Sequence, residues 1–220
     1  MDMMSWLPEN IATYGPEVDW LFYLIYYITG GVFVLVTVAM LVFVVLYRHR
    51  EGRRAVYTHG HTGLEIAWTV APTLILVVLT AISVPAWTKI KSRIPESDLH
   101  IRITAKQFNW EVTYPGPDGK FDTEDDQTFD NEIHVPTGKP VVLHLRSKDV
   151  IHSVFIPWAR FKQDAVPGRE IEQWLQVTKP GKYEVPCAEL CGFGHSGMKG
   201  FLFVHTPEQF QQWLKEKWPS

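Results

Sequence analysis

Residues 20–47 read WLFYLIYYITGGVFVLVTVAMLVFVVLY, a run of 28 residues without an acidic, lysine or arginine side chain. A second run of this kind, residues 66–88, is 23 residues long. An α-helix needs about 20 consecutive apolar residues to cross the hydrocarbon core of a bilayer. Core helices of a soluble domain are rarely apolar over such lengths. The two runs therefore predict a two-helix transmembrane hairpin over residues 20–88.

The loop between the two runs is rich in arginine. It contains Arg48, Arg50, Arg53 and Arg54 against the single acid Glu51. Positively charged loops remain on the cytoplasmic or matrix side of a membrane. We therefore expect residues 1–19 to form an outer N-terminal segment, and residues 89–220 to form a domain on the periplasmic or intermembrane side of a bacterial or mitochondrial inner membrane. Residues 1–19 contain four acids and no base, unlike the start of a signal peptide.

After the hairpin, the hydrophobic pattern changes to short runs. Residues 99–104 and 141–146 alternate apolar and polar side chains, as strands do. Further candidate strands lie at residues 151–156, 171–177 and 200–204. The sequence Thr206-Pro207-Glu208 then predicts the start of a helix. The outer domain is thus predicted to be an all-β sandwich or barrel of antiparallel strands, closed by a C-terminal helix.

Both cysteines of the chain lie in CAELCGFGHSGM, residues 187–198. Thiolates, an imidazole (His195) and a thioether (Met198) are the ligands that copper selects, and a weak axial thioether is typical of copper electron-transfer sites. With two thiolates, the economical arrangement is a pair of coppers bridged by both sulfurs and bound by one imidazole each. Because one electron is then shared over two metals, each bond changes little on electron transfer.

The second imidazole must come from elsewhere in the sheet. We expect it to be His152, which lies in SKDVIHS at the start of a strand-like run. Met198 can supply its thioether, and Glu189 can supply its backbone carbonyl. The remaining histidines of the outer domain are expected only to form hydrogen bonds: His100, His134, His144 and His205.

Two alternatives exist for the cysteine segment. Two cysteines and two histidines are a standard zinc set, but zinc would leave Met198 unexplained. An oxidising compartment also permits a disulfide between Cys187 and Cys191, which would give no reason for the neighbouring His195 and Met198.

Three motifs together resemble subunit II of cytochrome c oxidase, in the haem–copper oxidase family, over most of the chain from residue 65 to residue 213. The segment CAELCGFGHSGM resembles the binuclear copper (CuA) loop of that family and is highly specific. The segments DVIHS and KQDAVPGR, at residues 149–153 and 162–169, resemble the strand and loop that bring the first histidine. LEIAWTVAPTLIL, residues 64–76, resembles the start of the second transmembrane helix.

The resemblance implies a cupredoxin-like outer domain and a role in respiratory electron transport. Such a subunit takes electrons from a cytochrome c at CuA and passes them to haem in subunit I, where reduction of oxygen to water is coupled to proton pumping. This chain alone would not reduce oxygen, and it would assemble with subunit I, other oxidase subunits and the lipid bilayer. The implied copper ligands are His152, Cys187, Glu189 (backbone oxygen), Cys191, His195 and Met198.

Two further acids acquire roles through the resemblance. The side chain of Glu189 would bind a magnesium ion at the seam with subunit I, although a plain exposed acid is the alternative. Glu65 stands where many family members have a glutamate at the entrance of a proton path. An ionisable residue at the edge of a membrane span is a functional candidate, and the alternative is an acid in interfacial water.

The chain departs from the family at the position of electron entry. Where the family often has GHQWYW, this chain has AKQFNW at residues 105–110, so Phe108 replaces the tryptophan that usually faces cytochrome c. Trp110 matches the later aromatic residue, which is expected in the core. Entry through Phe108, or through another aromatic residue such as Trp158, remains open.

The net charge and the distribution of charged residues give little information about function. The net charge of -3 gives no basic field for nucleic acid. Residues 118–132 contain seven acids and one base. This segment is predicted to be a solvated hairpin tip, while steering of a basic cytochrome c and binding of a calcium ion are alternatives.

Two rival functions follow from the same residues. A membrane-tethered copper carrier would deliver the metal rather than electrons, and its Cu(I) would be colourless and silent in EPR. The equivalent subunit of a quinol oxidase is disfavoured, because such relatives typically lack the copper ligands.

Overall fold

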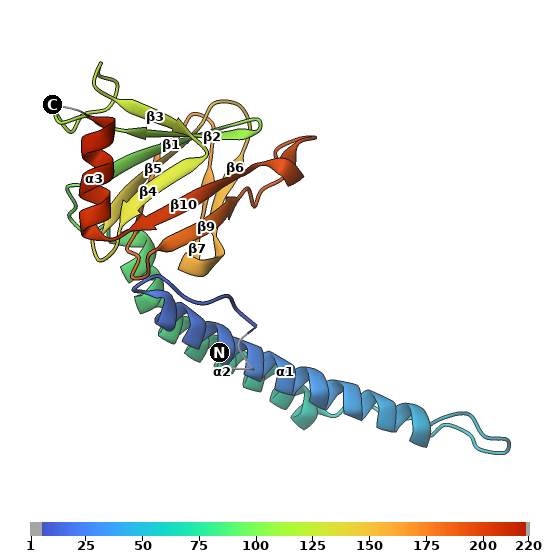
Figure 1. Cartoon of the computed structure of the whole chain (residues 1–220). Coiled ribbons are helices and arrows are strands. Elements are labelled where there is room, and N and C mark those ends of the chain that lie inside the picture. The colour runs from blue at the N-terminus through green and yellow to red at the C-terminus, as the bar shows by residue number, and fades with distance from the viewer. Residues whose placement is uncertain (1–5, 219–220) are drawn as a thin grey trace. The chain divides into compact units, whose positions relative to one another are not determined.

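The computed structural model describes residues 6–218, which divide into two compact units. One unit consists of residues 17–89 and is helical (Figure 1). The other combines the residues before Glu17 with those after Lys89 and is built mainly of strands.

The helical unit is a hairpin of two long apolar helices. Helix α1 spans Gly15–Leu46 and α2 spans Thr62–Trp87, and a short π-helical turn, Thr88–Ser92, follows α2. The mean hydropathy of their most apolar windows is 2.7 and 2.1. The chain runs out along α1 and returns along α2 (Figure 1). The prediction of two long apolar helices is confirmed, and both are long and apolar enough to cross a membrane, although each begins a few residues earlier than its uncharged run.

The β unit contains two main sheets and a separate pair of strands. The first sheet has the strand order β3-β2-β1-β5-β8, and the second has the order β4-β10-β9. The strands of the first sheet are β1 His100–Lys106, β2 Asn109–Tyr114, β3 Gln127–Asp130, β5 Val141–Ser147 and β8 Ile171–Leu175. Those of the second sheet are β4 Glu132–Pro136, β9 Gly181–Pro186 and β10 Lys199–His205, and the pair comprises β6 His152–Ile156 and β7 Phe161–Ala165.

The expectation of antiparallel strands is wrong at two pairings. Strand β1 pairs in parallel with β5, with Ile101 opposite Leu143, and β10 pairs in parallel with β4. The alternation of apolar and polar side chains reports the face that each residue occupies. It does not report the direction of the neighbouring strand, which depends on contacts between distant segments. Strands β2, β3, β4, β7 and β9 had also not been foreseen.

The core lies between the sheets, and along the strands buried side chains alternate with more exposed ones, as expected. Along β1, Ile101, Ile103 and Ala105 are fully buried, while His100 and Thr104 lie on the other face and are partly exposed. A strand places successive side chains on opposite faces, so one face of the five-stranded sheet meets the core and the other is polar.

The C-terminal helix α3, Pro207–Lys217, begins as predicted. The Thr206 side chain accepts a hydrogen bond from the Gln209 N–H, and the Gln209 side-chain oxygen accepts one from the Thr206 N–H, which forms a capping box. Phe210 and Trp213 face the core and are buried. Burial of each aromatic side chain contributes about 2 kcal/mol to closing this end of the sheets.

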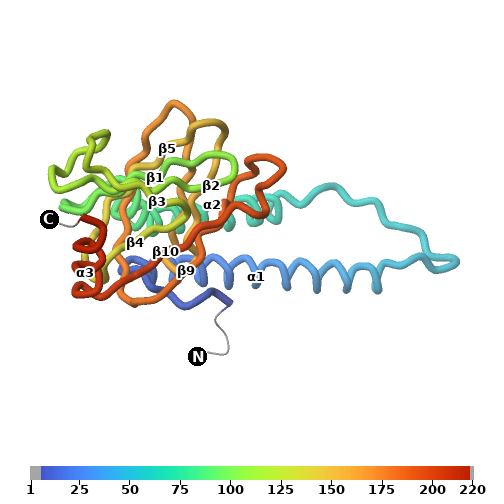
Figure 2. Tube along the Cα trace, turned by 45° about the horizontal axis from the view of Figure 1, so that its top comes forward, coloured from blue at the N-terminus to red at the C-terminus, as the bar shows by residue number. Residues whose placement is uncertain are grey.

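Residues ahead of the hairpin belong to the β unit. Ile11 and Tyr14 are almost completely buried, and Ala12 forms a bridge with Val177. The Ile11 N–H donates to the carbonyl of Trp158 at 2.9 Å. In Figure 2 this blue segment lies beside strands at the other end of the colour scale. The chain therefore contributes to the β unit from both sides of the hairpin.

Candidate metal centre

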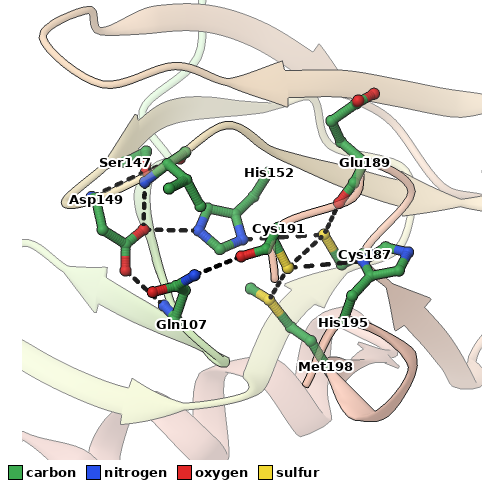
Figure 3. A network of polar contacts seen from close by, with 10 residues as sticks. Gln107, Ser147, Asp149, His152, Cys187, Glu189, Cys191, His195 and Met198 are labelled. Atoms are coloured by element: carbon green, nitrogen blue, oxygen red, sulfur yellow. Dashed lines mark hydrogen bonds and ion pairs between the residues drawn. The ribbon is translucent and has the colours of Figure 1, made fainter. Parts of the chain in front are cut away.

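Three segments that are distant in the sequence meet at one end of the β unit. His152 begins β6, the loop 187–198 connects β9 to β10, and the turn at residues 107–108 connects β1 to β2. Figure 3 shows His152, His195 and Met198 around the two cysteine sulfurs, with Gln107 reaching the loop backbone. The loop is held in place because the Cys187 N–H donates to the Met198 carbonyl at 3.0 Å, and Cys187 forms a bridge with Val154 of β6.

The predicted copper ligands lie together. The Cys187 and Cys191 sulfurs are 3.9 Å apart, and both cysteines are free thiols rather than a disulfide. His152 Nδ1 lies 4.0 Å from the Cys187 sulfur, and His195 Nδ1 lies 3.6 Å from the Cys191 sulfur. The Met198 sulfur lies 3.8 Å from the Cys191 sulfur. One imidazole is thus adjacent to each thiol.

The two parts of Glu189 point in different directions. Its backbone carbonyl lies 3.2 Å from the Cys187 sulfur, where the sequence analysis places a weak ligand. Its carboxylate is exposed and points away from the sulfurs (Figure 3). The carbonyl is therefore available to the sulfur cluster and the carboxylate to another partner.

Burial and proximity act together on the thiols. Burial, followed by the neighbouring Cys187, raises the pKa of the Cys191 thiol to about 11. Two thiolates at this distance in a buried site require a nearby cation, because like charges in a medium of low polarity repel each other strongly. The donor set of two thiolates, two imidazoles and a thioether fits copper. The residues present thus suit a copper centre chemically.

A ring of hydrogen bonds behind His152 had not been predicted. His152 Nε2 lies 2.8 Å from the Asp149 carboxylate, which also accepts the Gln107 N–H at 2.7 Å. The Gln107 side-chain amide in turn donates to the Cys191 carbonyl at 2.5 Å. Burial alone would raise the pKa of Asp149, but hydrogen bonds from His152, Gln107 and Val150 lower it.

This hydrogen-bond network decides which nitrogen of the His152 imidazole has an unshared lone pair. A carboxylate accepts hydrogen bonds, so the neutral ring carries its proton on Nε2 and presents the lone pair of Nδ1 to the Cys187 sulfur. Such an outer partner orients a metal-binding imidazole and raises its basicity. The spacing of Asp149 and His152 in DVIH was the one sequence signal that pointed to this contact.

Phe108 lies against the loop that carries the cysteines. Its side chain is 40% exposed, and a Cβ atom added at Gly194 would lie 2.5 Å from its ring. At Gly192 the corresponding distance is 3.3 Å. The ring therefore covers the loop backbone and also faces solvent.

The other two aromatic candidates are placed differently. Trp110 is 1% exposed, and its ring centroid lies 6.0 Å from that of His152, so it is a core residue beside the site. Trp158 follows the far end of β6 and packs against Tyr183 with centroids 5.9 Å apart. At about 3.3 Å per residue, that strand spans about 13 Å from His152 to Ile156, and Trp158 lies beyond its end.

The remaining predicted residues lie elsewhere. Glu65 is in the first turn of α2, within the helical unit. In the acidic segment, Asp122 pairs with Arg102 at 2.6 Å, and the Thr123 hydroxyl lies within hydrogen-bond distance of Asp125 and Asp126. The four other histidines of the β unit form two hydrogen-bonded pairs, each with 2.9 Å between ring nitrogens: His100 with His144, and His134 with His205.

Comparison with known proteins links both units to one family. Residues 7–86 match the transmembrane domain of cytochrome c oxidase subunit II, and residues 118–202 match its periplasmic domain. The chain is 30% identical to an alternative cytochrome c oxidase subunit 2 of Bradyrhizobium diazoefficiens, over 96% of this chain and 83% of that protein.

Two further relatives agree. The chain is 31% identical to cytochrome c oxidase subunit 2 of Cereibacter sphaeroides, over 91% of this chain and 76% of that protein. The crystal structure of the periplasmic domain of subunit II of cytochrome oxidase from Bradyrhizobium japonicum superposes with a TM-score of 0.50 and 32% identity. It covers 57% of this chain and 96% of that domain. The expected cupredoxin-like β domain with two apolar helices is confirmed, and the chain belongs to the cytochrome c oxidase subunit II family of the haem–copper oxidases.

Proposed function

We propose that this chain is the electron-entry subunit of a membrane-bound cytochrome c oxidase. The observation that carries the proposal is the cluster of two thiols, each with an imidazole within 4.0 Å and with a thioether beside one of them. Its ligands would be His152, Cys187, the Glu189 carbonyl, Cys191, His195 and Met198. When bound there, a copper pair supplies one-electron transfer between an external donor and the haem of subunit I.

The chain's own residues keep this site rigid and shielded. Cys187, Cys191 and Met198 are at most 8% exposed, and His152 is fully buried. The backbone bond from Cys187 to Met198 closes the loop at its base, while Gln107 ties it to the turn between β1 and β2, and Asp149 ties that turn to His152. A preorganised shell of this kind limits movement when the charge of the site changes.

Phe108 is the proposed contact for the donor. Of the three aromatic candidates, it alone both reaches solvent and lies against the cysteine loop. The neighbouring Phe193 and Leu190 are also strongly exposed on this loop. A cytochrome c that docks over these side chains would approach the sulfurs through the Phe108 ring. Residues 118–132 would form a solvated hairpin tip, with steering of a basic cytochrome c and binding of calcium as the alternatives.

Two roles would link this chain to subunit I and to proton transfer. The Glu189 carboxylate, which points away from the sulfurs, would bind magnesium at the seam between the subunits. Glu65, at the start of α2, would open a proton path that serves proton pumping. The β unit would then lie on the periplasmic or intermembrane side.

The decisive experiment is EPR spectroscopy of the purified chain after copper loading. A shared spin gives a seven-line copper pattern with a purple absorption, and two coppers per chain by metal analysis. A single copper with a four-line pattern, or silent Cu(I) that is handed to a copper acceptor, would favour a copper carrier instead. Turnover of the assembled oxidase with cytochrome c and with quinol separates the two classes of oxidase.

A further inference from the structure

The outer face of the five-stranded sheet carries a second cluster of metal-binding side chains. His100 lies on β1, His144 on β5 and Glu172 on the edge strand β8, and His144 and Glu172 are directly opposite each other across the strand pair. Glu170 immediately precedes β8. The copper ligands come from other segments, so this cluster is a separate feature of the β unit.

The Nδ1 atom of His144 faces two carboxylates. It lies 3.1 Å from Oε1 of Glu170 and 3.6 Å from Oε1 of Glu172. The residue is only 8% exposed, whereas both glutamates are partly open to solvent. A buried nitrogen is thus aimed at two anionic oxygens at the surface.

Hydrogen bonds on the other side of the ring decide whether Nδ1 carries a proton. His100 Nε2 lies 3.0 Å from the Ser97 carbonyl, which can only accept, so Nε2 of a neutral His100 is protonated and its Nδ1 is an acceptor. His100 Nδ1 lies 2.9 Å from His144 Nε2, which must therefore donate. With both rings neutral, His144 Nδ1 is left with a lone pair.

Two carboxylates that face this nitrogen at hydrogen-bond distance require a positive charge there, which is either a second proton on the His144 ring or a metal ion held by all three residues. We propose that His144, Glu170 and Glu172 bind a divalent transition metal of the zinc type, and that His100 positions the His144 ring. Imidazole and carboxylates are established zinc ligands, and three protein ligands leave a fourth position for water. His100 accepts the hydrogen bond from His144 Nε2, and it thereby takes the place of the carbonyl or carboxylate that usually orients a metal-binding histidine.

The distances suit this metal. Two ligand atoms of a tetrahedral zinc with bonds of about 2.05 Å lie about 3.3 Å apart. The two measured separations from His144 Nδ1, 3.1 and 3.6 Å, lie on either side of that value. The three ligand atoms all lie within 4.8 Å of one another. Small side-chain rotations of two exposed glutamates would complete the site.

The nearby arginines leave the metal-binding oxygens free. Arg146 pairs with Oε2 of Glu170, so it occupies the oxygen that does not face His144. Arg102, opposite His144 on β1, is held by Asp122 and lies over the Phe121 ring. A metal at this site would link the edge strand β8 to the interior strand β5.

The test uses the full chain in detergent with Cys187→Ser and Cys191→Ser, which remove the competing thiols. We expect this protein to retain one equivalent of zinc after dialysis, with only nitrogen and oxygen neighbours in X-ray absorption. Adding Glu172→Gln, which changes an exposed side chain, should weaken zinc binding at least about tenfold. His100→Phe should weaken it about 10–100-fold by releasing the ring of His144. The matched control is Glu184→Gln on β9, which should change nothing.

Two outcomes would overturn the proposal. One is that the protein without the cysteines retains no zinc and nitrogen-15 NMR finds His144 doubly protonated at neutral pH, since the cation is then a proton. The other is that Glu172→Gln and Glu184→Gln bind zinc equally well, since zinc then binds elsewhere.

Discussion

His152 and His144 occupy opposite kinds of surroundings and are oriented in the same way. Each ring is held by a hydrogen bond that its Nε2–H donates, to Asp149 in one case and to His100 in the other, and each turns Nδ1 toward potential metal ligands. Beside His152 these ligands are buried sulfurs, whereas beside His144 they are exposed carboxylates. The orienting device is shared, so the partner atoms decide which metal each place suits: soft sulfur selects copper, and oxygen with imidazole suits zinc.

The largest difference between the two sites is expected when a bridging sulfur is removed from the sulfur site. Cys191→Ser is expected to abolish the paired copper spectrum and to reduce electron entry at least about 100-fold, because hydroxyl oxygen is a poor ligand for copper. EPR and copper analysis measure the first effect, and oxidation of cytochrome c by the assembled oxidase measures the second. The control is Ser196→Ala in the same loop, which should leave the spectrum unchanged. Retention of the full purple band in Cys191→Ser would exclude a bridging role.

The outer hydrogen bond of His152 should have the next largest effect. Asp149→Asn is expected to weaken copper binding about 10–100-fold, since it removes the acceptor that fixes the His152 tautomer. Competition with a copper chelator measures this change. Asp164→Asn is the matched control, because Asp164 bonds to the neighbouring Ser153 instead. Equal affinities in the two variants would show that the orientation of His152 does not depend on Asp149.

A smaller effect is expected at the surface of the copper loop. Phe108→Ala should slow oxidation of the native donor several-fold and leave the copper spectrum nearly unchanged, because the ring covers the loop without contributing a ligand atom. Stopped-flow kinetics of donor oxidation measures the rate. Phe193→Ala is the control for loss of an exposed aromatic side chain on the same loop. If the two variants are slowed equally, the role of Phe108 is docking rather than specific entry.

The pair formed by His134 and His205 is expected to make stability depend on pH. Burial lowers the pKa of His134, with a further contribution from His205, while Glu132 opposes the shift. Its ring stacks on Trp213 with centroids 4.5 Å apart.

Below the ordinary histidine pKa, the unfolded chain therefore binds more protons at this position than the folded chain does. The melting temperature should fall as the pH decreases from about 7.5 to about 5. Calorimetry of His134→Gln should show a flatter dependence on pH, and His59→Gln, in the exposed interhelical loop, should not. The same slope in both variants would assign the effect to other groups.

Local patterns in the sequence predicted what depends on local chemistry. The uncharged run at residues 20–47 predicted a membrane helix, because the bilayer imposes its length on any segment that crosses it. The grouping of Cys187 to Met198 predicted the sulfur cluster, because one loop supplies most of its atoms. His152 was expected from its position at the start of a strand. Whether these side chains bind copper remains a prediction.

Contacts between distant segments could not be predicted from the sequence. Gln107 reaches the Cys191 carbonyl across 84 residues, and nothing near either residue indicates it. The parallel pairing of β1 with β5 depends in the same way on the path of the chain. His144 was expected only to form hydrogen bonds, since its carboxylate neighbours become visible when β8 is placed beside β5.

The burial of Ile11 and Tyr14 in the β unit has a consequence for biogenesis. The residues that complete this unit are synthesised before the hairpin, and the strands that receive them are synthesised after it. The β unit is therefore complete only when residues from both sides of the hairpin lie on the same side of the membrane. An error in the topology of the first helix would separate Ala12 from Val177, and Tyr14 from the Trp174 ring that it contacts.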